Sequence, residues 1–186
     1  MRLDLEFALL AGAVDRRHVE DALNEVDRLT ETIDDLLALA RDTHGDREVL
    51  DLGALFDEIE AEWHGRLALE GRPLRIARPD DLPPVRASDA AARQILSVLV
   101  TNAAVHGEGI TTVTARRTSD CVALDVEDEG PGFPADVEGS FARRPDGGSR
   151  HGIGLALARA LAEAEGGRLV VTRPGPHPIV SLLFPT

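Results

Sequence analysis

Residues 110–132 read ITTVTARRTSDCVALDVEDEGPG, and this segment carries the most information about the fold of the chain. Two runs rich in β-branched residues, 110–115 and 121–126, lie on either side of the polar turn TSD. This pattern predicts a hairpin of two antiparallel strands. The segment DEGPG begins where the second strand ends, and its glycines predict a turn in which another group can approach the backbone closely.

The segments around this hairpin predict a mixture of helices and strands. In chain order they are a helix capped by Asp51 and ending near Gly65, a strand at 74–77, a helix capped by Ser88 and reaching Asn102, a helix at 153–165 ended by glycines 166 and 167, and strands at 169–172 and 179–184. Because helices and strands do not alternate strictly, we predict an α+β fold. The expected architecture is a two-layer α/β sandwich, a mixed sheet covered by helices on one face.

The first 44 residues predict a separate helical part. Apolar residues recur there at alternating steps of three and four, at Val19, Ala22, Val26, Leu29, Ile33, Leu36 and Ala40. This spacing is a heptad seam, which needs a partner helix. A shorter helical segment at 2–10 precedes it, so we predict an α-helical hairpin. The polar segment 41–48 places the boundary, which gives predicted domains at 1–44 and 45–186.

The composition excludes several classes of function. A formal net charge of −13 over 186 residues argues against a nucleic-acid partner, because phosphate backbones are held by clustered basic residues. The single cysteine, Cys121, excludes an internal disulfide and fits a reducing cytoplasm. No run approaches the roughly 18 apolar residues of a membrane span. We expect a cytoplasmic chain without membrane contact of its own, which is compatible with the cytoplasmic part of an inner-membrane receptor.

Asn102, in VTNAAVHG, is the first candidate for chemistry. Its amide is predicted near the end of an apolar helix, where burial without a partner costs roughly 1–3 kcal/mol. An amide oxygen suits Mg²⁺, a hard cation that keeps several waters and takes phosphate oxygens as further ligands. A backbone partner at the helix end would explain the same residue, so both interpretations stay open.

Asp128 is the second candidate, at the end of the second hairpin strand. Its carboxylate could accept a hydrogen bond from an exocyclic amine such as that of adenine. Gly130 and Gly132 follow it, and glycines let a flat ring approach the backbone. An ordinary turn at a strand end has the same composition, so the motif is weak by itself.

The third candidate is the start of the helix at 153–165, in the sequence GGSRHGIGLALARALAEAEGG. Gly152 and Gly154 stand where helix amides and the helix dipole favour an anion. The chain is locally basic just before this point, at Arg143, Arg144, Arg150 and His151. Close packing alone would also explain the two glycines. The spacing matches neither a P-loop nor a dinucleotide-binding fold.

Taken in order, these three segments resemble the Bergerat-type ATPase domain of bacterial sensor histidine kinases. The resemblance covers roughly residues 48–186. The preceding EVDRLTETIDDLLALAR resembles the second helix of the hairpin through which these kinases dimerise and transfer phosphate. The resemblance therefore implies a histidine protein kinase of two-component signalling. Such a kinase uses ATP and Mg²⁺, dimerises through its N-terminal helices and has a response regulator protein as partner.

The resemblance also implies roles for single residues. Asn102 would bind Mg²⁺, Asp128 would read adenine, and Gly130 and Gly132 would form the floor of the base pocket. Phe141 resembles the aromatic anchor of a mobile lid over ATP. The other positions that the resemblance assigns to the nucleotide are His106, Gly152, Ile153, Gly154 and Leu155, with the two glycines facing the phosphates.

The chain also departs from the pattern of that family. The phosphoacceptor motif is absent, and His18, in the sequence HVE, does not match it. Val98 stands where a second polar residue is frequent, and Val105 where a basic residue often reaches phosphate. Arg150 replaces an expected glycine.

Three hypotheses follow for the function. The leading one is that the chain donates the γ-phosphoryl of ATP to a histidine outside the chain. The second is a stand-alone serine kinase of the anti-sigma-factor kind, which the heptad helix disfavours. The third is a catalytically degenerate dimeric scaffold, which the departures at Val98 and Val105 would explain.

Overall fold

The computed structural model describes residues 48–79, 81–133 and 152–186, with the backbone alone for 152 and 153. The described helices are α3 (Leu52–Leu69), α4 (Asp89–His106) and α5 (Gly152–Ala164). The strands of the main sheet are β2 (Leu74–Ala77), β4 (Thr111–Arg117), β5 (Cys121–Glu127), β6 (Arg168–Arg173) and β7 (Ile179–Pro185).

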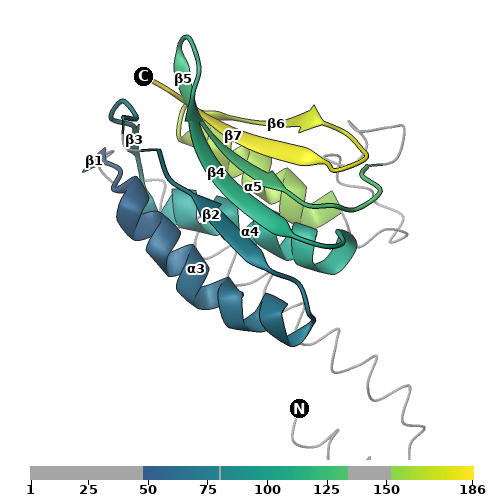
Figure 1. Cartoon of the computed structure of the whole chain (residues 1–186). Helices are drawn as coiled ribbons and strands as arrows, with labels where there is room; N and C mark the ends of the chain where they lie inside the picture. The colour runs from purple at the N-terminus through teal and green to yellow at the C-terminus, as the bar shows by residue number, and fades with distance from the viewer. Residues whose placement is uncertain (1–47, 80, 134–151) are drawn as a thin grey trace, which may run out of the picture. The chain divides into compact units, whose positions relative to one another are not determined.

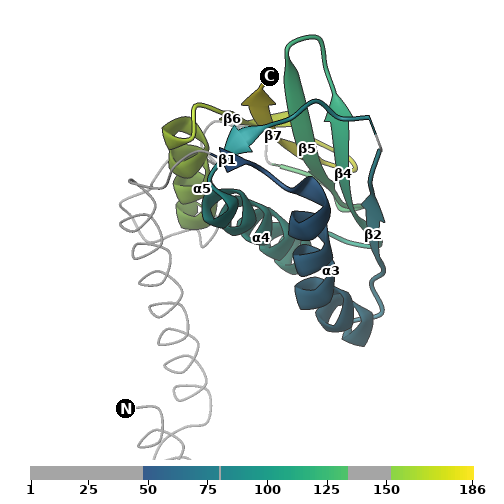
Figure 2. The ribbon, with the colours of Figure 1, turned by 90° about the vertical axis from the view of Figure 1, so that its left-hand side faces the viewer.

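The main sheet has five strands in the order β2-β4-β5-β7-β6. β2 runs parallel to β4, and every other neighbouring pair is antiparallel. Helices α3, α4 and α5 lie on one side of this sheet (Figures 1 and 2). The predicted α+β sandwich with a mixed sheet is therefore confirmed, and β5 lies at the centre of the sheet.

The register of the β4–β5 hairpin explains which face of the sheet meets the helices. Val113 lies opposite Val126 and Ala115 opposite Leu124, and these four side chains are at most 4% exposed. The alternate positions face away from the helices. There Asp125 accepts a hydrogen bond from Arg116 Nε at 2.5 Å. This alternation of apolar and polar positions is the pattern expected of a sheet covered on one side.

The predicted helix starts are confirmed. Asp51 Oδ1 accepts the Ala54 N–H at 3.0 Å, and Ser88 Oγ accepts the Ala91 N–H at 3.3 Å. Such caps satisfy amides that have no partner within the helix. The predicted strands also occur, with ends that differ by at most two residues.

The predicted end of α3 near Gly65 is wrong. The helix continues to Leu69 and ends in a left-handed cap at Gly71, whose φ is +70°. The N–H groups of Gly71 and Arg72 bind the carbonyls of Ala68 and Leu67 at 3.0 and 2.9 Å. These two bonds satisfy the last turn of the helix. A glycine inside a helix costs too little to stop it when one face of the helix is buried.

A small sheet was not predicted from the sequence. The two-residue strands β1 (Glu48–Val49) and β3 (Arg86–Ala87) pair antiparallel and form it. Strands this short leave no periodic pattern, because their pairing depends on contacts between segments far apart in the sequence.

Other predictions fall outside the described residues. The helical hairpin and the boundary at residues 44 and 45 lie there, so both stay predictions. Among the helices that the structure does describe, none has the length and apolar character needed to cross a bilayer.

The two glycines near the end of α3 provide a matched test of the cap. Gly71→Ala should lower the free energy of unfolding by about 1 kcal/mol, because a Cβ is disfavoured at positive φ. Gly65→Ala should raise it by roughly 0.5–1 kcal/mol, because Gly65 lies inside the helix and its Cβ would meet nothing within 4 Å. Urea unfolding of both variants checks the prediction, and equal signs for the two changes would contradict it.

Candidate functional site

Asn102 lies in the last turn and a half of α4 and is half-buried. The helix ends at His106, and the Gly107 N–H donates to the Ala103 carbonyl at 2.8 Å. The loop after this bond turns back toward the end of β5. The structure thus brings the first predicted segment next to the second.

Asp128 follows β5 directly, and its side chain is only 7% exposed. The Gly130 N–H donates to its Oδ1 at 2.7 Å, and the Glu108 N–H also donates to the carboxylate. Glu129 and Glu108 are joined by a backbone hydrogen bond of 2.9 Å. The carboxylate is therefore held between its own turn and the loop that follows α4.

Two glycines allow this close approach. A Cβ on Gly107 would overlap the Asp128 carboxylate, and a Cβ on Gly130 would lie 2.6 Å from Asp128 Oδ1. No side chain fits at either position without moving the carboxylate. Gly130 was predicted as a site residue, whereas Gly107 was not.

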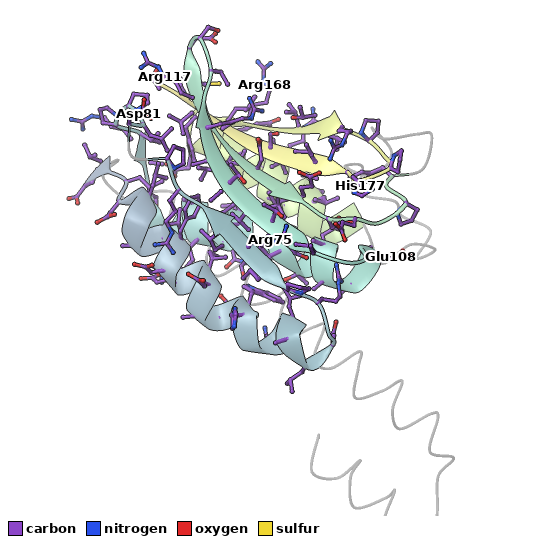
Figure 3. All side chains as sticks on the ribbon, viewed as in Figure 1. Arg75, Asp81, Glu108, Arg117, Arg168 and His177 are labelled. Carbon is purple, nitrogen blue, oxygen red and sulfur yellow. The ribbon has the colours of Figure 1, made fainter. Side chains whose placement is uncertain are left out.

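Gly132 has a different neighbour. Its φ is +93°, and a Cβ there would overlap the Pro174 carbonyl in the loop between β6 and β7. The same loop donates the His177 N–H to the Gly130 carbonyl at 3.0 Å. Contact with this loop therefore accounts for Gly132, and its role as floor of a base pocket stays a prediction. His177 and Glu108 lie toward the same end of the sheet (Figure 3).

Burial raises the pKa of Asp128 above its ordinary value. The N–H donors of Gly130 and Glu108 and the charge of Arg72 oppose this shift, because each favours the ionised form. The nearby Glu127 adds to the rise of the pKa. A carboxylate has acceptor capacity for more than two donors, so Asp128 can still accept a hydrogen bond from a ligand in addition to those from Gly130 and Glu108.

The third predicted segment starts α5. A Cβ on Gly154 would lie 3.4 Å from Val98 Cγ1, so the first turn of α5 packs closely against α4. Val98 is one helical turn before Asn102. Leu155 is 2% exposed and belongs to the core. The backbone amides of the first turn, from Gly152 onward, are thus placed beside the α4 face that carries Asn102.

The remaining predicted positions are placed as follows. His106 is exposed at the end of α4, and Val105 next to it is 66% exposed. Phe141 and Arg150 lie outside the described residues, as does His18.

The donor set near Asn102 is sparse. Within 48–79, 81–133 and 152–186 no group of three or more His, Cys, Asp or Glu side chains could hold a metal ion. A metal site built from several of these side chains is therefore absent from this part of the chain. Asn102 as one oxygen ligand fits Mg²⁺, which is commonly held by one or two protein groups together with water and substrate phosphate.

A family model described as "Histidine kinase-, DNA gyrase B-, and HSP90-like ATPase" matches residues 87–186, which contain all three segments. The chain belongs to this family. Within it, the chain contains the ATP-binding catalytic domain of a sensor histidine kinase. The resemblance seen in the motifs is thereby confirmed.

Curated relatives of this domain are sensor kinases. SasA, an adaptive-response sensory kinase of Parasynechococcus marenigrum (strain WH8102), is 31% identical over an alignment of 200 positions that covers 94% of this chain and 51% of SasA. The sensor histidine kinase ZraS of Escherichia coli (strain K12) is 28% identical over 172 residues, which cover 87% of this chain and 36% of ZraS. The chain thus spans about half or less of the length of these relatives.

Solved structures agree on the fold. The histidine kinase AdeS of Acinetobacter baumannii superposes with a TM-score of 0.73 at 21% identity, covering 99% of this chain and 92% of AdeS. Full-length ShkA, solved in complex with AMPPNP, gives a TM-score of 0.70 at 25% identity, covering 92% of this chain and 39% of ShkA.

The ionisation of Asp128 gives a pH test on the unliganded domain. Because its native pKa is raised, the native state binds this proton more tightly than the unfolded chain does. Protonated Asp128 therefore stabilises the native state. This contribution is fully present at pH values below the pKa of Asp128 in the unfolded chain, and it is lost as the pH rises through the pKa of Asp128 in the native state. Asn cannot ionise, so the stability of Asp128→Asn relative to the wild-type domain should rise as the pH is raised above about 4, the ordinary pKa of an aspartate.

Thermal unfolding of both proteins across this pH range measures the difference. Asp120→Asn, in the exposed turn before β5, is the control for a general loss of negative charge. If the unfolding midpoint of Asp128→Asn minus that of the wild-type domain stayed constant or fell with rising pH, the raised pKa of Asp128 would be contradicted.

Proposed function

We propose that this domain binds ATP with Mg²⁺ and donates the γ-phosphoryl to a histidine outside the chain, in two-component signal transduction. The observation that carries the proposal is the buried Asp128 carboxylate, which receives two backbone N–H groups and is enclosed by Gly107 and Gly130. A buried acceptor of this kind suits the amino group of adenine. The reported relatives and structures are histidine kinases, which favours this hypothesis over a serine kinase.

The proposed roles follow the three segments. Asp128 accepts the adenine amino group, and Asn102 provides an oxygen ligand to Mg²⁺. The first turn of α5, residues 152–155, faces the phosphates with its backbone amides. His106 and Phe141 complete the nucleotide-binding set, with Phe141 in the lid.

In the proposed reaction, a ring nitrogen of the acceptor histidine forms a bond to the γ-phosphorus while the bond to the bridging oxygen of ADP breaks. Mg²⁺, when bound, neutralises charge on the phosphate oxygens. The protein mainly positions the groups and stabilises charge in such a transfer. Asp128 and its glycines fix the base, and the amides at the start of α5 orient the phosphate chain.

The proposed partners are an acceptor histidine outside this chain, a second copy of the protein and a response regulator. Residues 1–44 would form the dimer through their heptad seam. We place the domain in the cytoplasm, where ATP is available, either alone or as the cytoplasmic part of an inner-membrane receptor.

Nucleotide binding is tested by thermal unfolding with and without Mg²⁺–ATP. ATP at about 100 times its Kd should raise the midpoint by roughly 5–10 °C, and the rise should require Mg²⁺. Asn102→Ala should remove most of the rise. Thr101→Ala, the exposed neighbour whose hydroxyl binds the Ser97 carbonyl, should keep it. Absence of any rise in the unchanged domain would favour a scaffold without catalysis.

Phosphoryl transfer is tested with ATP labelled in the γ-phosphate. The domain alone should remain unlabelled, because its sequence lacks the phosphoacceptor motif. Addition of a helical hairpin that carries this motif, taken from a relative, should give acid-labile phosphate on the hairpin. Acid-labile label on this chain itself that disappears in His18→Ala would overturn the proposed acceptor.

A further inference from the structure

Arg72 lies between α3 and β2 and had no part in the sequence-based site. Its backbone is fixed by the cap of α3, because its N–H donates to the Leu67 carbonyl at 2.9 Å. The next residue, Pro73, accepts the Thr111 N–H at 3.0 Å and so joins the start of β2 to β4. The backbone at Arg72 is therefore fixed by hydrogen bonds to α3 on one side and to β4 on the other.

The guanidinium of Arg72 binds the end of α4 and the start of β4. Nη1 donates to the carbonyls of Ala103 and Ala104 at 3.0 and 2.7 Å. Nε donates to the Gly109 carbonyl at 3.1 Å, and Nη2 to Thr111 Oγ1 at 3.4 Å. One planar group thus spans the whole loop between the helix and the strand, residues 107–110.

This arrangement suits the local charges. The last carbonyls of a helix carry the negative end of its dipole, and most of them lack a partner within the helix, although the Ala103 carbonyl also accepts the Gly107 N–H. A planar cation with several fixed donors can satisfy more than one of these carbonyls, whereas a lysine ammonium cannot keep the same geometry.

The loop that Arg72 spans is the one that holds Asp128. Glu108 lies within it and donates its N–H to the Asp128 carboxylate. The Glu108 carbonyl accepts the Glu129 N–H at 2.9 Å, and Ile110 donates its N–H to Glu129 Oε2 at 3.0 Å. If the loop moved outward, Asp128 would lose a donor and the enclosure by Gly107.

We propose that Arg72 is a positioning residue for adenine recognition: it holds the loop 107–110 against Asp128 and so fixes the carboxylate that selects the base. The proposal rests on the proposed function, because it takes Asp128 as the adenine acceptor. The charge of Arg72 acts in the same direction, since it favours the ionised, accepting form of Asp128.

The test compares the dissociation constants of Mg²⁺–ATP and Mg²⁺–GTP by titration calorimetry on folded protein. The unchanged domain should prefer ATP by at least about tenfold, because GTP presents an oxygen where ATP presents the amino group. Arg72→Gln should reduce this preference severalfold, mainly by weakening the binding of ATP. Arg72→Lys should give an intermediate preference.

Arg78→Gln is the matched control. Arg78 also lies close to α3 and β2, but it pairs with Asp57 and Glu60 on the exposed side of α3. Its removal should leave the preference for ATP unchanged. If Arg72 contributed to stability alone, Arg72→Gln would have a lower unfolding midpoint. The ratio of the ATP and GTP dissociation constants of the folded variant would then equal that of the wild-type domain.

The outcomes separate the two proposals. Binding of neither nucleotide by the unchanged domain would overturn the proposed function and this inference with it. ATP binding without a preference over GTP would overturn the inference alone. A preference that persists in Arg72→Gln would overturn the inference as well. If that variant does not fold, Arg72→Lys decides, and an unchanged preference there overturns it.

Discussion

The burial of the Asp128 carboxylate is the constraint around which this end of the domain is arranged. A carboxylate that is 7% exposed must find donors within the protein, since desolvation of a charge is costly. Its two backbone donors come from Gly130 and Glu108, on different segments. Both segments must pass within hydrogen-bond distance of one carboxylate, and this requirement excludes a Cβ at Gly107 and Gly130.

The sheet places that carboxylate. β5 lies at the centre, between β4 and β7, so its C-terminal end is held by a strand on each side. The loop from β6 to β7 then closes on the same turn through the His177 N–H and the contact of Pro174 with Gly132. The position of Asp128 thus depends on long-range pairing, while its hydrogen bonds come from the turn 128–130 and from the Glu108 N–H.

The helices and strands could be predicted because helix caps and the alternation of apolar and polar residues in strands involve only residues that are close together in the sequence. The Asp51 and Ser88 caps and the β4–β5 hairpin were all visible in short windows. The three motif segments were found for the same reason. Gly107 and Arg72 were missed, because their importance lies in contacts with residues 21 and more than 30 positions away. One arginine among 20 basic residues carries no sign of such a contact.

Helix α4 is the shared frame of the candidate site. It carries Asn102, its last carbonyls bind Arg72, and its C-terminal loop binds Asp128. Val98 on the same helix lies beside the start of α5, because a Cβ at Gly154 would be in van der Waals contact with Val98 Cγ1 at 3.4 Å. An apolar side chain at position 98 therefore fills the space between α4 and α5, although the family often has a polar residue there. Through these contacts Asn102, the Asp128 carboxylate and the backbone amides at the start of α5 are all positioned relative to one helix, so a shift of α4 would alter all three together.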